Sequence, residues 1–257
     1  LIVDDGSIDE TEKLITKFIN DDKIIIRYYK QENGGKHRAI NKGLDVAKGE
    51  LFFIVDSDDI LPRESLSSII AHYVKIKDDD SIVGVVGLKC YHNGQIVGTN
   101  VKQEEIICTS LEYRYKYKIK GDRAEVIKTS IFKQYKFPEF NNERFLPESI
   151  VWNKMALKNK LLFFSENIYE CEYFADGLSN SSIRLRKNNP RGITTLYAEL
   201  ASYPIPFIKK LRTTINYWRF ARFLEEPFNV KVQRIGLLRS FLVMPLLPIV
   251  FYLDNKK

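Results

Sequence analysis

The sequence predicts an α/β fold built around a parallel sheet. Between residues 1 and 75, short apolar runs alternate with longer segments whose apolar residues recur at helical spacing, which is the order strand, helix, strand, helix, strand. The connections are short, as in sheets made from right-handed crossovers. Polar clusters follow the strands directly. Because ligands bind at the carboxyl ends of such strands, we expect the functional site at this edge.

The first 75 residues contain six predicted strands and helices. The first helix is amphipathic, because Leu14, Ile15, Phe18 and Ile19 fall on one side of it. The second helix is ended by Gly49, a residue that punctuates helices. The predicted strands are residues 1–3, 24–29 and 51–55; the helices are residues 9–20, 37–47 and 63–75; the turns are residues 4–7 and 32–36.

The middle of the chain has a mixed pattern. Residues 82–108 have the pattern of strands, and His92-Asn93-Gly94-Gln95 within them is a favourable turn sequence. Residues 109–120 are dense in Tyr and Lys. A helix is predicted over residues 150–157.

The C-terminal part differs in character. Residues 193–224 are predicted to be helical, with Arg and Lys among Tyr, Trp and Phe. Residues 236–253 are strongly apolar and about as long as a membrane span. Pro245 and Pro248 argue against one straight helix there.

Composition is that of a large domain with an appendage. The chain has 257 residues, 44% of them hydrophobic, and we expect one domain over residues 1–180 and a helical region over residues 181–257. The net charge of +7 and a pI near 9.1 suit an anionic partner, such as nucleic acid, an anionic membrane surface or a charged small ligand. Cys90, Cys108 and Cys171 match no metal-ligand or disulfide pattern, so we expect buried free thiols in a reducing compartment.

Three carboxylates follow the strand predicted at residues 51–55. Asp56 and Asp58 form an Asp-x-Asp pattern, and Asp59 comes next. Carboxylates crowded at a strand end repel one another and call for a neutralising partner. A divalent cation carrying a diphosphate would supply it, because Mg²⁺ prefers one or two carboxylates and phosphate oxygens. The alternative is a polar loop before the next helix, with Asp59 as its N-cap and Pro62 in its first turn.

Two further polar clusters fall at the same edge. Asp4 and Asp5 follow the first strand and can accept hydrogen bonds from a nucleotide base or ribose, although, taken alone, a turn and helix cap explains them better. Gly35 and Lys36 lie in Asn33-Gly34-Gly35-Lys36-His37. This stretch can form a phosphate-binding loop, since glycines permit close backbone approach and Lys adds charge. It is not a P-loop, and a plain strand-to-helix turn remains open.

Glu148 is a candidate general base. It follows Pro147 and precedes an apolar helical stretch that contains Trp152, and a carboxylate in such surroundings can accept a proton during catalysis. The alternative is a glutamate in the first turn of a helix, where the helix dipole favours it.

The C-terminal region suits an interfacial membrane anchor. Basic residues stand beside an apolar segment that prolines interrupt, which is typical of segments that lie on an anionic membrane. Two alternatives remain open: a helical subdomain whose apolar face is core, and an RNA-binding module. No recognised nucleic-acid motif accompanies the basic residues, so nucleic acid is not the expected partner.

Taken together, these motifs resemble the nucleotide-binding half of family 2 glycosyltransferases, which have the GT-A fold, a Rossmann-like mixed sheet flanked by helices. The resemblance follows residues 1–65 in order and is looser over residues 66–180, where it is closest to bacterial cell-surface polysaccharide transferases. The pieces that carry it are Ile2-Val3-Asp4-Asp5-Gly6-Ser7, Asn33-Gly34-Gly35-Lys36, Asn41-Lys42-Gly43-Leu44, Ala47-Lys48-Gly49-Glu50, Asp56-Ser57-Asp58-Asp59, Gly121-Asp122 and Pro147-Glu148-Ser149.

The resemblance implies an inverting transfer of a sugar from a nucleotide-diphosphate sugar, by default a UDP-sugar, to a glycan or lipid-linked acceptor. It implies that Asp4 and Asp5 hold the nucleoside, with Gly35, Lys36 and Asp56 also in the nucleotide site. It implies that Asp56, Asp58 and Asp59 hold Mg²⁺ or Mn²⁺ on the diphosphate. The enzyme would act at the cytoplasmic face of a bacterial cell membrane, reached through the C-terminal region.

Two departures accompany the resemblance. In many relatives the base is the Asp of a Glu-Asp pair, whereas this chain has Glu148-Ser149; Glu148 is then the candidate base, with Asp122 in reserve. The chain also opens on Leu1 without Met, and we expect that a first strand and its loop precede it. Two competing functions stay open: a sugar nucleotidyltransferase, and a non-catalytic nucleotide-sugar-binding or membrane scaffold protein.

Overall fold

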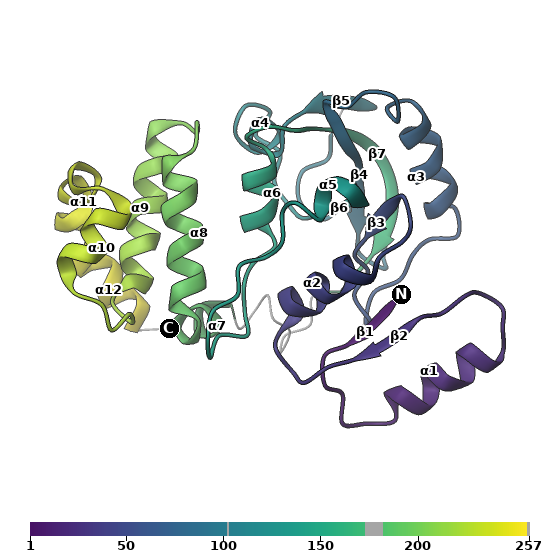
Figure 1. The fold of residues 1–257 in the computed structure, drawn as a ribbon. Coiled ribbons are helices and arrows are strands. Elements are labelled where there is room, and N and C mark those ends of the chain that lie inside the picture. The colour runs from purple at the N-terminus through teal and green to yellow at the C-terminus, as the bar shows by residue number, and fades with distance from the viewer. Residues whose placement is uncertain (102, 173–181, 256–257) are drawn as a thin grey trace.

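A five-stranded mixed sheet forms the centre of the structure, a computed structural model that describes residues 1–101, 103–172 and 182–255 (Figure 1). Its strand order is β3-β6-β4-β7-β5. β4 and β7 pair in parallel, and the other neighbours are antiparallel. The strands are β3 (Leu51–Phe53), β4 (Ile82–Cys90), β5 (Glu105–Cys108), β6 (Arg123–Lys128) and β7 (Lys160–Glu170).

Helices cover both faces of this sheet and form two apolar cores. On one face α3 (Ser65–Val74) packs against inward side chains of β4, β6 and β7. The other face is covered by α2 (Lys36–Val46), α4 (Ser110–Tyr115), α5 (Thr129–Phe132) and α6 (Ser149–Met155). This three-layer arrangement is how a sheet with two apolar faces is buried.

Alternation along β6 decides which of its side chains face the second core. Ala124 and Val126 belong to the core under α3, whereas Ile127 belongs to the core under α6. Because successive side chains of a strand point to opposite faces, Glu125 faces the same side as Ile127. An acidic residue is therefore placed on an interior face of the sheet.

The N-terminal strands form a sheet of their own. β1 (Ile2–Asp4) pairs in parallel with β2 (Tyr28–Lys30), and α1 (Thr11–Asn20) connects them. The crossover predicted from the sequence is confirmed. The third predicted strand behaves differently, because β3 pairs antiparallel with β6 in the central sheet and not with β1 or β2.

Two sequence interpretations at this end are wrong. The strand expected at residues 24–29 is confined to Tyr28–Lys30, and Ile24 and Ile25 are exposed. The helix α1 is amphipathic, as expected, but of its four apolar residues only Ile15 is buried, because α1 lies away from the central sheet (Figure 1). Asp59 caps no helix, since α3 begins at Ser65 with Glu64 at its N-cap.

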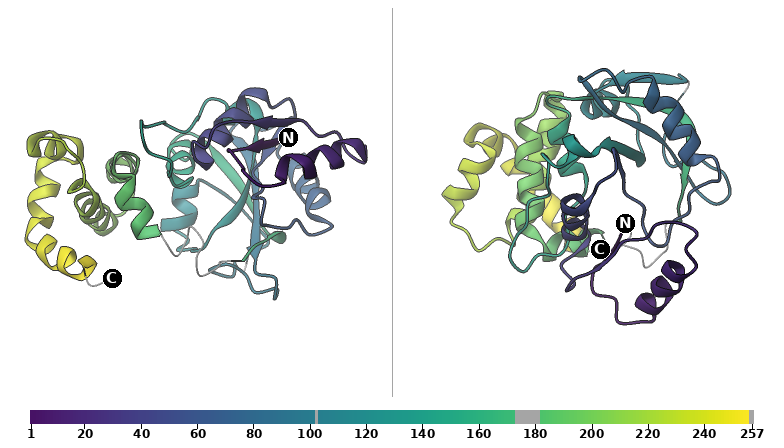
Figure 2. Two further views of the ribbon diagram at one scale, coloured as in Figure 1. Left: turned by 90° about the horizontal axis from the view of Figure 1, so that it is seen from below. Right: turned by 45° about the vertical axis from the view of Figure 1, so that its right-hand side comes forward.

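The C-terminal helices gather beside the α/β domain, with α8 in contact with α6 (Figure 2). Their core is formed around Tyr217 and Trp218 of α9. The domain boundary predicted at residues 180 and 181 lies outside the described residues. The helices are α7 (Ser182–Asn188), α8 (Pro190–Ser202), α9 (Phe207–Ala221), α10 (Phe228–Ile235), α11 (Leu237–Val243), the 3₁₀ turn η1 (Met244–Leu246) and α12 (Leu247–Asn255).

The last helices also match two expectations from the sequence. The stretch Leu237–Asp254 is long and apolar enough to cross a membrane, by length and composition only. It is not a regular α-helix throughout, because η1, which contains Pro245, separates α11 from α12. The three cysteines are buried and free, as expected.

Candidate active site

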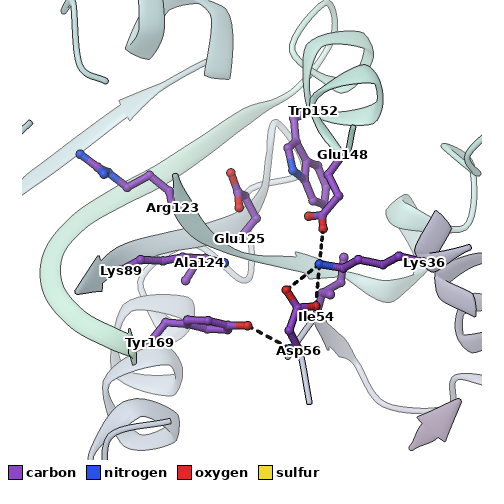
Figure 3. A pocket seen from close by; sticks show the side chains of 10 residues that line it. All are labelled: Lys36, Ile54, Asp56, Lys89, Arg123, Ala124, Glu125, Glu148, Trp152 and Tyr169. Atoms are coloured by element: carbon purple, nitrogen blue, oxygen red, sulfur yellow. Dashed lines mark hydrogen bonds and ion pairs between the residues drawn. The ribbon is translucent and has the colours of Figure 1, made fainter. Parts of the chain in front are cut away.

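Lys36 links the loop after β3 to the start of α6 through two ion pairs. It is the first residue of α2, and its Nζ lies 2.5 Å from Oδ1 and 2.7 Å from Oδ2 of Asp56. The same Nζ lies 2.7 Å from Oε1 of Glu148, at the start of α6 (Figure 3). Burial opposes the ammonium charge, but the Glu148 and Asp56 carboxylates outweigh that effect and raise the pKa of Lys36. Lys36 is therefore a firmly held cation between two carboxylates.

A small cavity surrounds this ion-pair cluster. Its volume is about 10 Å³, which is room for about one water molecule. Its walls come from the loop after β3, from β4, β6 and β7 of the sheet, and from α2 and α6 (Figure 3). The lining residues are Lys36, Ile54, Asp56, Lys89, Arg123, Ala124, Glu125, Glu148, Trp152 and Tyr169.

Tyr169 anchors the carboxylate loop that follows β3. Its hydroxyl accepts a hydrogen bond from the Asp56 N–H at 2.9 Å and donates one to the Asp59 carboxylate. The Nζ of Lys89 lies 3.9 Å from the centre of the Tyr169 ring, a favourable cation–π distance. Tyr169 and Lys89 carry no signal in the sequence, because no local pattern links β7 or β4 to this loop.

The carboxylate loop suits a divalent cation by the chemistry of its groups. Asp56 and Asp58 offer oxygen ligands, and Asp58 is exposed. Burial raises the pKa of Asp59, and the neighbouring Asp56 and Asp58 carboxylates add to the rise. No three metal-binding side chains converge within the described residues, so a cation here would take at most two protein carboxylates, as Mg²⁺ on a diphosphate does.

Asp4 is committed to local structure. It is buried, its Oδ1 accepts the Ser7 N–H at 2.7 Å, and its Oδ2 accepts the Tyr28 hydroxyl at 2.6 Å. Burial opposes its charge, but the Tyr28 hydroxyl and the Ser7 N–H outweigh that effect and lower the pKa of Asp4. These bonds hold β1, β2 and the turn after β1 together.

Asp5 and Gly35 bind each other. Oδ1 of Asp5 accepts the Gly34 N–H at 2.9 Å, and Oδ2 accepts the Gly35 N–H at 2.7 Å. Gly35 has φ of 95°, and a Cβ there would lie 1.9 Å from the carbonyl oxygen of Arg144. The close approach that this glycine permits is therefore to the protein's own backbone. The nucleotide contacts of Asp4, Asp5 and Gly35 stay predictions.

The reserve base Asp122 and a further carboxylate, Glu125, lie next to and on β6. Asp122 precedes the strand, is exposed, and is not among the residues that line the cavity. Glu125 does line it. Burial raises the pKa of Glu125 to about 8; Lys89 opposes this rise, and Glu148 and Asp122 add to it. The sequence carries one signal for Glu125, an acidic residue in the otherwise apolar interior of a strand.

Comparison with protein-family models decides the family. The model described as "Glycosyl transferase family 2" matches residues 1–148, more than half of the chain. The chain belongs to glycosyl transferase family 2. The matched segment ends at Glu148, so it contains the Lys36 cluster, the carboxylate loop and Glu125 of this family 2 chain.

Two bacterial proteins illustrate its relatives. "Glycosyltransferase GlyG" of Streptococcus pneumoniae serotype 4 is 28% identical over 180 residues, which cover 66% of this chain and 59% of that protein. "Poly(ribitol-phosphate) beta-N-acetylglucosaminyltransferase TarS" of Staphylococcus aureus is 25% identical over 150 residues, or 58% of this chain and 24% of TarS. The chain thus spans well under two thirds of the length of these relatives.

Solved structures confirm the fold class predicted from the sequence. TarS 1–349 in complex with UDP superposes with a TM-score of 0.59 at 20% identity and covers 99% of this chain and 77% of that one. TarS itself gives 0.60 at 18% identity, with 98% and 47% covered. At this level of identity the likeness concerns the fold alone, a GT-A arrangement of a mixed sheet between helices.

Proposed function

We propose that this family 2 chain is a glycosyltransferase that moves a sugar from a nucleoside-diphosphate sugar, by default a UDP-sugar, to a hydroxyl of a glycan or lipid-linked acceptor in bacterial cell-surface glycan synthesis. One observation carries the proposal: Lys36 forms ion pairs with Asp56, in the loop after β3, and with Glu148, at the start of α6, and all three residues line one small cavity. Glycosyl transfer needs both a diphosphate site and a proton acceptor at close range. TarS, named for N-acetylglucosamine transfer, was solved with UDP-GlcNAc and with UDP, which supports a UDP-sugar.

The residues divide the chemistry between them. The acceptor oxygen attacks the anomeric carbon from the face opposite the diphosphate, so the configuration inverts. A divalent cation held by Asp56 and Asp58, with Asp59 beside them, would stabilise charge on the departing nucleoside diphosphate. The Lys36 ammonium adds positive charge at the same edge. From the sequence, Glu148 is the candidate that accepts the acceptor proton, and Asp122, which does not line the cavity, is the reserve.

The donor site is tested by thermal unfolding with UDP, GDP and CDP, each with and without Mn²⁺. A ligand that binds only the folded state raises its stability, by about 2.7 kcal/mol at a concentration of 100 Kd. We expect one nucleotide to raise the melting temperature, only with Mn²⁺. The Asp58→Ala variant should lose this shift, whereas Asp80→Ala, an exposed aspartate before β4, should keep it. A shift that persists without Asp58 would contradict the cation site.

The reaction type is tested by the product. A glycosyltransferase releases nucleoside diphosphate from a UDP-sugar, whereas a nucleotidyltransferase would release pyrophosphate. Binding of the nucleotide without release of either would instead indicate a non-catalytic protein. Glu148→Gln should lower turnover, because the amide can neither accept a proton nor form the ion pair with Lys36.

The C-terminal helices suit a place on the cytoplasmic face of the cell membrane. Ser240, Val243, Leu247 and Asp254 recur at helical spacing and are buried against the other helices. The opposite side forms an exposed apolar face. That face consists of Leu237, Leu238, Phe241, Leu242, Leu246, Ile249, Tyr252 and Leu253.

The net charge of the C-terminal region indicates what kind of surface this apolar face would bind. Residues 181–257 contain 14 Lys and Arg against 4 Asp and Glu, a net charge of +10, whereas residues 1–180 contain 26 and 29, a net charge of −3. An apolar face in a strongly basic region fits an anionic bilayer. Because Asp254 pairs with Arg219 and is buried, the segment is suited to lie on the membrane surface, where this packing is kept.

Vesicle co-sedimentation tests the membrane proposal. We expect the protein to pellet with phosphatidylglycerol vesicles, less so with phosphatidylcholine, and less at high salt. The double variant Leu238→Asp and Phe241→Asp should abolish pelleting. A matched pair on α3, Leu66→Asp and Ile70→Asp, replaces equally apolar, exposed residues and should leave pelleting intact. Equal loss in both pairs, or no pelleting of the wild type, would contradict the proposal.

A further inference from the structure

Two carboxylates approach the cavity from opposite sides. Glu148 comes from the start of α6, and Glu125 comes from β6, on the sheet face that α6 covers. Figure 3 shows both around the same space, with Trp152 beside Glu148. Because Asp56 lines this cavity too, both carboxylates stand next to the edge at which the proposed donor would bind.

The two carboxylates differ in their partners. Glu148 has the Lys36 Nζ at 2.7 Å, and Lys36 also holds Asp56. The Glu148 carboxylate is therefore held in an ion pair with an ammonium group. Among the residues that the structure describes, no Lys, Arg or His nitrogen lies within ion-pairing distance of Glu125. Lys89, whose charge opposes the rise in the pKa of Glu125, has its Nζ 3.9 Å from the centre of the Tyr169 ring.

Burial without an ion-pair partner favours the protonated form of a carboxylate. Burial raises the pKa of Glu125 to about 8, Lys89 opposes this, and the Glu148 and Asp122 carboxylates add to it. A general base works best when its proton affinity is matched to the working pH. Ser149, which follows Glu148, supplies only a hydroxyl and cannot take this role.

We propose that Glu125 is the catalytic residue that takes the proton from the acceptor hydroxyl, and that Glu148 is a positioning residue that holds Lys36 at the donor edge. The inference rests on the proposed glycosyl transfer. In the step, the acceptor oxygen forms a bond to the anomeric carbon while the bond from that carbon to the diphosphate oxygen breaks. The electron pair of the broken bond leaves with the nucleoside diphosphate, and the acceptor proton moves to a carboxylate oxygen of Glu125.

The test measures UDP release from UDP-N-acetylglucosamine, UDP-glucose and UDP-galactose with Mn²⁺. Enzyme is in excess over donor and water serves as the acceptor. We expect Glu125→Gln to slow release about 100-fold or more, with an unchanged Mn²⁺-dependent thermal shift by UDP. Glu104→Gln, an exposed glutamate before β5, should match the wild type. Glu125→Ala should be accelerated by sodium formate and not by sodium chloride, since formate can enter the vacated space and accept the proton.

The outcomes separate the two proposals. Release by Glu125→Gln within about threefold of the wild type, or formate rescue of Glu148→Ala in place of Glu125→Ala, would overturn the role of Glu125 and leave glycosyl transfer standing. A wild type that neither binds UDP nor releases it from any of the three donors would overturn the proposed function and this inference with it. Formate rescue is informative here because a residue with a purely structural role would not respond to it.

Discussion

Glu125 should make the stability of the folded protein depend on pH in a way that one substitution removes. The carboxyl has an ordinary pKa of 4.5, and burial raises its pKa to about 8 in the folded protein. Below pH 4.5 the carboxyl is protonated in both the folded and the unfolded state, so its burial does not lower the free energy of unfolding. Between pH 4.5 and 8 the unfolded chain releases a proton that the folded protein retains, so the free energy of unfolding falls as pH rises and levels off above pH 8.

The size of the effect follows from the shift. Each pKa unit corresponds to about 1.36 kcal/mol, so the wild type should lose about 3 kcal/mol between pH 5.5 and 8.5 relative to a variant without this carboxyl. Glu125 keeps some contact with solvent, which lowers the expected difference to about 2 kcal/mol. For a chain of this size that is a change of roughly 4–8 °C in melting temperature.

The assay compares urea and thermal unfolding of the wild type, Glu125→Gln and Glu104→Gln at pH 5.5 and 8.5. Glu125→Gln should gain stability over the wild type as pH rises, because the amide has the same shape and no charge to bury. Glu104→Gln should follow the wild type at both values, since Glu104 is exposed. If the difference between Glu125→Gln and the wild type is the same at both pH values, the carboxyl is ionised in the folded protein and the reasoning fails.

Three further predictions concern stability and the carboxylate loop. Gly35→Ala should lower the free energy of unfolding by about 3 kcal/mol or more, because its Cβ would lie 1.9 Å from a backbone carbonyl oxygen in a left-handed conformation. The control Gly94→Ala, at φ 81° with open space around it, should cost only about 1–2 kcal/mol. Equal losses of stability in urea unfolding would contradict the clash. Asp254→Asn should lower the free energy of unfolding by about 3 kcal/mol, since the substitution leaves the partly buried Arg219 without its carboxylate partner. An unchanged denaturation midpoint would show that the ion pair is dispensable. Tyr169→Phe should lower the free energy of unfolding by about 1–2 kcal/mol and weaken the Mn²⁺-dependent thermal shift by UDP, because the loop after β3 loses its anchoring hydroxyl. A full thermal shift in calorimetry would show that other contacts position this loop.

Local patterns predicted most of the elements but not all of their partners. The helices near residues 37–47, 63–75 and 150–157 and the strands near residues 1–3 and 51–55 are confirmed to within a few residues, because periodicity and turn residues are properties of neighbours in the chain. The partner of β3 was not predictable in the same way. β3 pairs with β6, some seventy residues later, and a run of apolar residues does not specify which distant strand it joins.

The sequence by itself predicted a ligand edge from the aspartates after β3 and the glycine turn before α2, and it carried the resemblance that the family comparison confirmed. Only the tertiary structure decided how those residues are used. It places Lys36 between Asp56 and Glu148. It brings the Arg144 carbonyl so close to Gly35 that no Cβ fits there, and it makes Glu125 part of the cavity lining. The physical reason is distance along the chain, since charge pairing and burial depend on which segments the fold brings together, and no local spacing records that.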